Sequence, residues 1–168
     1  MRRRQFISDN VTEKQRKMND NSKRQPLLET IIIIRHGSYS EDGGLDKNGR
    51  IQITKSAEQL KEVIKGKGAT IVTSPLKRAV ESSQIIADML KLSLEKNDAL
   101  SCESVEKNKL KEFIEKLKQK KKEVIILVTH QPNIMDICEI LLDSDYVVPT
   151  REMVYLPSGG YHIAKKQK

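Results

Sequence analysis

The hydrophobic positions of this chain fall into short apolar runs separated by longer amphipathic segments. The runs at 31–34, 69–72 and 124–128 are rich in β-branched residues. They predict strands buried on both faces, as in the middle of a parallel sheet. Between the runs, apolar residues recur at intervals of three and four, which is typical of helices with one buried face. This alternation predicts a three-layer α/β/α sandwich with a largely parallel central sheet.

Four helices and several short strands complete the expected order. The first helix follows Gly49 and ends at Gly66, and the second follows an N-cap at Ser74 and runs to about Leu90. The third helix covers about 105–119, and the fourth carries Ile134, Ile137, Cys138 and Leu141 inward. Short strands are expected at 92–94 on an edge of the sheet, and at 153–155 and 161–163 around a Gly159-Gly160 turn.

Charge divides the chain into an extension and a domain. Residues 1–25 carry eight basic and three acidic side chains and almost no large apolar ones, so we expect a disordered or weakly helical extension. Residues 26–168 then form one domain. The net charge of +8 belongs mainly to the two ends of the chain. A nucleic-acid-binding protein would gather basic residues on a folded face, so no nucleic-acid partner is expected.

The cysteines and the hydropathy of the chain indicate the cellular compartment to expect. Cys102 and Cys138 lie in unrelated contexts without metal-ligand spacing, and two free thiols suit a reducing cytosol. No apolar stretch approaches the roughly 20 residues of a membrane span. The basic start at 2–4 is not followed by the apolar core of a secretion signal. We therefore expect a cytoplasmic protein without a membrane span.

Charged side chains stand where the predicted strands end. Arg35 and His36 follow the first buried strand, Arg78 lies in the first turns of the helix after the second, and His130 follows the late strand. Ligand sites gather at this edge of parallel sheets. Guanidinium groups match phosphate oxygens, a neutral imidazole can attack phosphorus, and a second, protonated imidazole can neutralise charge on the oxygens. The pattern predicts a phosphate pocket that contains a nucleophile.

Four motifs give the chain a family resemblance. They are Arg35-His36-Gly37 after a hydrophobic strand, Leu45-Asp46-Lys47-Asn48-Gly49, Ser74-Pro75-Leu76-Lys77-Arg78-Ala79, and His130 after a buried strand. In this order they resemble the histidine phosphatase superfamily, also called phosphoglycerate mutase-like, although Asp46 stands where the family has Thr. The resemblance implies that His36 is a nucleophile forming a phosphohistidine intermediate. It also implies that Arg35, Arg78 and His130 bind the phosphoryl group, without a metal or other cofactor.

The short passage between Arg78 and His130 resembles the small phosphohistidine phosphatases of the SixA type. Those enzymes act on phosphohistidine in signalling proteins, so a phosphorylated signalling protein is the expected partner. Expelling an imidazole needs much less help from a general acid than expelling an alkoxide. Glu103 is the leading candidate for such an acid, although a carboxylate at a helix N-terminus reads equally as a favourable partner of the helix dipole.

Further candidates lie in the loop after the first strand. Glu41 and Asp42 are alternative acids. Gly37 and Ser38 are expected to bind substrate, although small family members often have Asp at the position of Ser38. Three other functions stay open: a small-molecule phosphomonoesterase, a phosphoglycerate mutase-like enzyme and a non-catalytic phosphoprotein-binding module.

Overall fold

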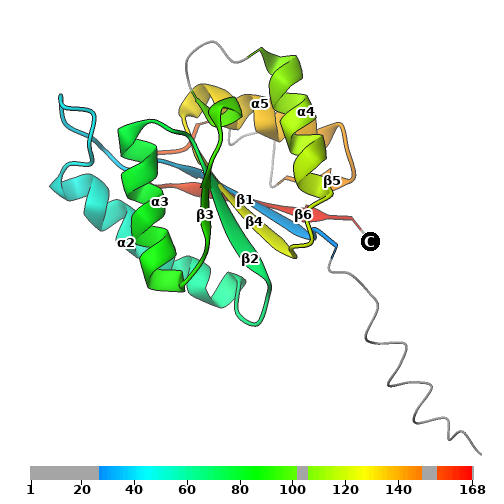
Figure 1. Ribbon diagram of the computed structural model, residues 1–168, viewed down its shortest axis with the longest axis horizontal. Helices are drawn as coiled ribbons and strands as arrows, with labels where there is room; N and C mark the ends of the chain where they lie inside the picture. Colours follow the sequence, from blue (N-terminus) through cyan, green and yellow to red (C-terminus); the bar gives the residue numbers. More distant parts are fainter. Residues whose placement is uncertain (1–26, 102–105, 149–154, 168) are drawn as a thin grey trace, which may run out of the picture.

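The central element of the fold is a six-stranded sheet (Figure 1). The computed structural model describes residues 27–101, 106–148 and 155–167. The strand order is β3-β2-β4-β1-β6-β5. The strands are β1 (Thr30–Arg35), β2 (Ala69–Thr73), β3 (Leu94–Lys96), β4 (Val124–Thr129), β5 (Tyr146–Val147) and β6 (Tyr161–Lys166). β1 to β4 pair in parallel, and β6 runs antiparallel to both of its neighbours.

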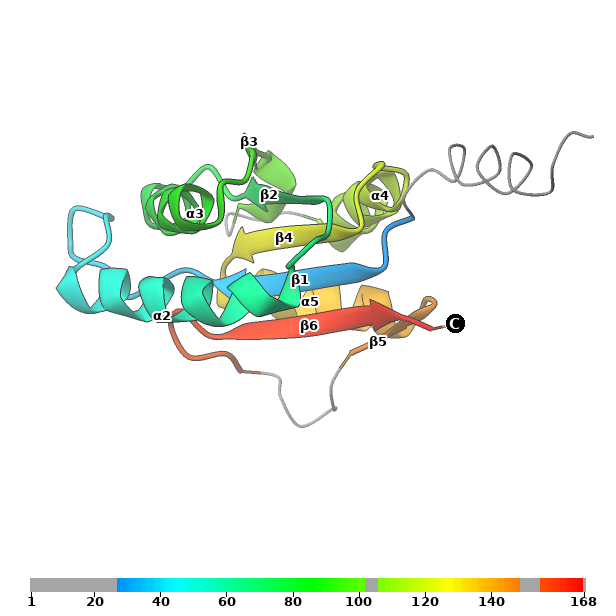
Figure 2. The same cartoon turned by 90° about the horizontal axis from the view of Figure 1, so that it is seen from below.

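Helices cover both faces of this sheet (Figures 1 and 2). One face carries α2 (Lys47–Val63) and α3 (Lys77–Leu90), and the other carries α4 (Lys107–Lys118) and α5 (Gln131–Leu142). A single 3-10 turn, η1 (Asp98–Leu100), leads out of β3. These layers confirm the predicted α/β/α sandwich with a largely parallel sheet, the fold of the histidine phosphatase and phosphoglycerate mutase-like proteins. None of the helices in the described ranges combines the length and the apolar character needed to cross a membrane.

β1 joins the two halves of the core. Ile31 and Ile33 pack in the cluster that includes the buried stripes of α4 and α5. Ile32 and Ile34 pack in the cluster formed with α2 and α3. All four side chains are fully buried, because alternate residues of a strand point to opposite faces of the sheet. The strand therefore delivers the residues that follow it from a rigid position.

The expected helices form, but the start of α3 differs from the prediction. Its N-cap is Leu76, which makes no capping bond through its side chain, so Ser74 is not the N-cap. The Ser74 hydroxyl instead lies in hydrogen-bond contact with His130.

The strand predictions hold less closely at the sheet edges. The edge strand forms two residues later than expected, and β5 has only two residues, too few for a sequence pattern. Tyr155 lies outside any strand, and the rest of the strand expected at 153–155 falls outside the described residues. The extension predicted at 1–25 also falls outside them.

The end of β1 and the start of α2 meet through two glycines. A Cβ on Gly37 would lie 2.6 Å from the Gly49 carbonyl oxygen, and a Cβ on Gly49 would lie 2.0 Å from the Ser38 carbonyl oxygen. A side chain at Gly37 would therefore clash with the backbone at the start of α2. Asp46 caps α2 by accepting the Gly49 N–H at 2.7 Å. Asp46 can therefore replace Thr at this position, because both side chains accept a hydrogen bond as N-cap residues.

Candidate active site

Register brings the two predicted site histidines together. β1 and β4 are parallel neighbours with Arg35 opposite Thr129, so His36 and His130 each follow at the same edge of the sheet. Their ring centroids lie 4.9 Å apart. Both side chains are nearly buried, with 4% of His36 and 3% of His130 exposed. The strand ends therefore converge as the sequence predicts.

The main chain fixes the tautomer of His36. Its Nδ1 lies 2.8 Å from the Gly37 carbonyl oxygen. A carbonyl oxygen can only accept, so Nδ1 carries the hydrogen and donates it. The lone pair of the neutral ring is then on Nε2, which accepts a hydrogen bond from Arg78 Nε at 3.2 Å. This ring presents a nucleophilic nitrogen to a cationic neighbour.

Burial keeps the His36 ring neutral. Desolvation is the largest cause lowering the pKa of His36 to about 4. The bond to the Gly37 carbonyl opposes this shift, while the charges of Arg78 and Arg35 reinforce it. An imidazole is a nucleophile only when it is neutral, so the His36 ring is in the form that nucleophilic attack requires at neutral pH.

His130 is held by a serine. Its Nε2 lies 2.8 Å from the Ser74 Oγ, and its Nδ1 is buried with no hydrogen-bond partner among the described residues. Burial lowers the pKa of His130 to about 3, followed by the effects of His36, Arg78 and Arg35. The same charges act on both rings, so the four predicted residues share one electrostatic site.

The lowered histidine pKa values predict a pH-dependent stability. Between about pH 6.5 and pH 4 the unfolded chain binds more protons than the folded one, so stability falls as the pH drops through this window. Urea unfolding at pH 7.0 and pH 4.5 measures this loss. A variant with both His36→Gln and His130→Gln should lose less stability between these two pH values. An equal loss in the variant and the parent would contradict the histidine assignment.

Each arginine lies over a tyrosine ring. The Arg78 guanidinium carbon is 4.6 Å from the Tyr39 ring centroid, and that of Arg35 is 5.1 Å from the Tyr155 ring centroid. The Tyr39 ring also meets the His36 ring edge-on, with centroids 5.3 Å apart. Cation–π contacts of this kind hold a guanidinium plane in place.

The segment around Leu156 forms one wall of the site. Arg35 Nη1 donates to the Leu156 carbonyl oxygen at 2.7 Å. Gln131 follows His130 directly in the chain, and its side-chain oxygen accepts a hydrogen bond from the Leu156 N–H at 3.0 Å. Farther along, the Gly159 N–H lies 3.1 Å from the carbonyl oxygens of both Arg35 and His36. These hydrogen bonds therefore hold the segment before β6 against the end of β1 and against the residue that follows His130 after β4.

The remaining predicted residues are engaged elsewhere or not described. The Gly37 N–H donates to Ser82 Oγ at 3.1 Å. The Ser38 hydroxyl donates to Asp46 at 2.7 Å, and its N–H donates to Gln52. Both backbones border the site, but these groups already have protein partners. Glu103 lies outside the described residues.

The alternative acids lie in the exposed loop between β1 and α2. Asp42 accepts bonds from the side chains of Lys77 and Ser40 and from the Gly44 N–H. These bonds, led by that of Lys77, hold the pKa of Asp42 well below its usual range. Asp42 is therefore ionised at neutral pH and poorly suited to donate a proton. Glu41 is exposed in the same loop.

Several residues that contact the site side chains have no recognisable pattern in the sequence. Tyr39, Tyr155 and Ser82 carry no motif, and Tyr155 stands 119 positions after His36. Ser74 is part of a recognised motif, but its spacing fits an N-cap as well as a histidine partner.

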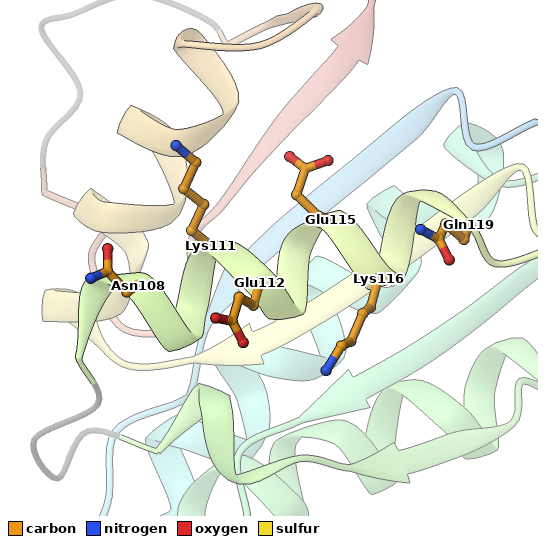
Figure 3. A pocket seen from close by; sticks show the side chains of 6 residues that line it. All are labelled: Asn108, Lys111, Glu112, Glu115, Lys116 and Gln119. Atoms are coloured by element: carbon orange, nitrogen blue, oxygen red, sulfur yellow. The ribbon is translucent and has the colours of Figure 1, made fainter.

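The structure shows one further surface feature. A shallow hollow follows the outward face of α4, lined by Asn108, Lys111, Glu112, Glu115, Lys116 and Gln119 (Figure 3). None of the site residues lines it. Within the described ranges, no group of His, Cys, Asp and Glu side chains is arranged to hold a metal ion.

Comparison with known proteins places this geometry in a family. Residues 31–103 match the sequence model of the histidine phosphatase superfamily, branch 1. The matched segment carries Arg35, His36 and Arg78. Together with the fold, this match indicates a phosphatase with a histidine nucleophile. A comparison of the sequence with curated proteins gave no significant match.

Solved structures share the fold at low sequence identity. A protein from Agrobacterium tumefaciens described as the "putative phosphohistidine phosphatase SixA" is similar with a TM-score of 0.63 and 12% identity, over 84% of this chain and 96% of that chain. A phosphoserine phosphatase mutant from Entamoeba histolytica has a TM-score of 0.60 and 18% identity, over 80% and 89% of the two chains. A phosphoglycerate mutase from Plasmodium falciparum has a TM-score of 0.55 and 24% identity, over 68% and 70%.

Proposed function

We propose that this phosphatase uses His36 as its nucleophile and hydrolyses phosphohistidine on a protein. The observation that carries the nucleophile assignment is the state of the His36 ring. Its Nδ1–H is held by the Gly37 carbonyl, and its Nε2 lies against Arg78 and near His130. A neutral imidazole oriented by its own main chain, with cations beside the attacking nitrogen, suits transfer of an anionic phosphoryl group.

The reaction has two steps in this proposal. The Nε2 lone pair of His36 forms a bond to phosphorus while the substrate's bond to phosphorus breaks, and the leaving group takes that electron pair and a solvent proton. Water then attacks phosphorus, the nitrogen–phosphorus bond breaks with its electrons returning to Nε2, and a proton from the water is released to solvent. The products are the dephosphorylated substrate and inorganic phosphate.

Arg35, Arg78 and His130 would stabilise the transferring group. Guanidinium donors match the phosphoryl oxygens and offset the charge that they carry. A bound dianion would raise the pKa of His130, which burial and neighbouring cations lower in the free protein. His130 would then take up a proton together with the substrate and donate it to a phosphoryl oxygen through Nδ1, the ring nitrogen that has no hydrogen-bond partner in the described part of the chain.

Three points favour phosphohistidine as the substrate. An imidazole is a good leaving group, so its departure needs little help from a general acid. The charged groups that shift the pKa of both histidines within the described ranges are arginines and histidine, which suit anion binding rather than proton donation to an alkoxide. The chain also covers 96% of the Agrobacterium SixA chain, as a compact domain of similar extent.

A substrate panel tests this proposal. We expect kcat/KM for a phosphohistidine peptide to exceed that for phosphoserine, phosphotyrosine and sugar phosphates by at least about 10²-fold. A positioned general acid contributes a rate factor of about this size, and only the phosphate monoesters need one. Glu103→Gln, measured on the same panel, should leave phosphohistidine turnover within about twofold. Equal or faster turnover of the sugar phosphates, with a large loss in Glu103→Gln, would instead identify a small-molecule phosphomonoesterase.

A further inference from the structure

Two tyrosines from distant parts of the chain flank the site. Tyr39 lies in the loop between β1 and α2, and Tyr155 lies in the segment before β6. Each places its ring against one of the two site arginines. They nevertheless keep large exposed fractions, 50% for Tyr39 and 68% for Tyr155. The other two tyrosines of the chain, Tyr146 and Tyr161, are more buried and donate hydroxyl bonds to Leu28 and Gln59.

The burial of the neighbouring groups shows where these rings lie. His36 is nearly buried, while the Tyr39 ring that touches it is half exposed. Tyr39 therefore stands between the buried histidine and the solvent, and Tyr155 occupies the corresponding exposed position beside Arg35, so both rings border the site. Contact with a guanidinium occupies one face of a ring, so an exposed ring still has aromatic surface to offer. A phosphoryl group on His36 would leave its departing group at this rim.

We infer that Tyr39 and Tyr155 form an aromatic subsite for the leaving group and give the enzyme a preference for flat, aromatic leaving groups. This inference rests on the proposed function, because it assumes phosphoryl transfer at His36. Stacking against an exposed aromatic ring depends on the orientation of the two rings, and it does not depend on the sequence of the protein that carries the substrate. It suits the imidazole of phosphohistidine, whichever protein carries it. The arginines bind the phosphoryl group, and the tyrosines select what is attached to it.

The matched substrates are phosphohistidine and phosphoramidate. Both contain a phosphorus–nitrogen bond, but only phosphohistidine has a ring in its leaving group. Tyr39→Leu and Tyr155→Leu should each lower the ratio of kcat/KM for phosphohistidine to that for phosphoramidate by about three- to tenfold. Tyr39→Phe and Tyr155→Phe should keep the ratio within about twofold, because the ring is retained. Tyr161→Leu, away from the arginines, serves as the matched control and should leave the ratio unchanged.

A purely positional role for the tyrosines gives a different result. If the rings only hold the arginines, the Leu variants should lower kcat/KM for both substrates equally and leave the ratio unchanged. That result, or no change for either substrate, would overturn the inference.

The aryl substrate p-nitrophenyl phosphate, paired with acetyl phosphate, separates this inference from the proposed function. Failure of the parent enzyme to prefer phosphohistidine over phosphate monoesters would remove the proposed substrate. A loss of the aryl preference in the Leu variants would still support the subsite in that case. An unchanged aryl preference would reject it.

Discussion

Replacing His36 with alanine should lower kcat/KM for phosphohistidine by at least about 10⁴-fold, the scale seen when a nucleophile is removed. The Gly37 carbonyl holds the Nδ1 hydrogen of His36, so the ring's lone pair is on Nε2, which faces Arg78. Steady-state hydrolysis by the purified His36→Ala protein measures the loss. Its thermal unfolding should be recorded alongside, because a buried histidine is also part of the packing at the end of β1.

His162 provides the matched histidine outside the site. It is buried in β6, opposite Ile33, and we interpret it as an ordinary strand residue. His162→Asn should retain activity in proportion to the folded fraction of the protein. Activity of folded His36→Ala within tenfold of the parent would contradict the nucleophile assignment.

Arg78→Ala should lower kcat by about 10²–10³-fold, the usual effect of removing one donor that stabilises developing charge. The Arg78 guanidinium donates to Nε2 of His36, the proposed attacking nitrogen, and lies on the Tyr39 ring, so it is held beside that nitrogen. Lysine retains the charge but not the planar fork, so Arg78→Lys should recover only part of the loss. Hydrolysis rates at saturating substrate give the comparison.

Arg50→Ala controls for the loss of a positive charge. Arg50 pairs with Glu81 on the surface of the protein, and exposed pairs contribute little to stability. Its removal should leave kcat within about twofold. A similar loss in Arg50→Ala and Arg78→Ala would mean that net charge, rather than the position of Arg78, governs the rate.

The sequence predicts the fold and the centre of the site because each rests on strong local patterns. Ile31 to Ile34 can only be accommodated between two apolar layers, so the run indicates a central strand on its own. The parallel pairing of β1 with β4 then follows from the alternation of strands and helices. Once those strands are neighbours, His36 and His130 have to meet at the sheet edge.

The supporting residues depend on tertiary contacts that local patterns do not encode. Ser74 before Pro75 has the pattern of an N-cap, but α3 begins only at Lys77, with Leu76 as its N-cap, and the Ser74 hydroxyl lies against His130. Gly37 was expected to bind substrate, and no local pattern shows that its lack of a side chain also admits the backbone of Gly49. Tyr155 reaches Arg35 only because the segment before β6 returns to the end of β1, which no spacing in the sequence reveals.

A histidine nucleophile must itself become phosphorylated during turnover. To detect this, the enzyme is quenched within milliseconds of mixing with ³²P-labelled phosphohistidine peptide, and the labelled residue is mapped. We expect a label that is stable in alkali, labile in acid, located on His36 and absent from His36→Ala. A label on His130 or on His162, or full turnover with no labelled enzyme at any time, would contradict it.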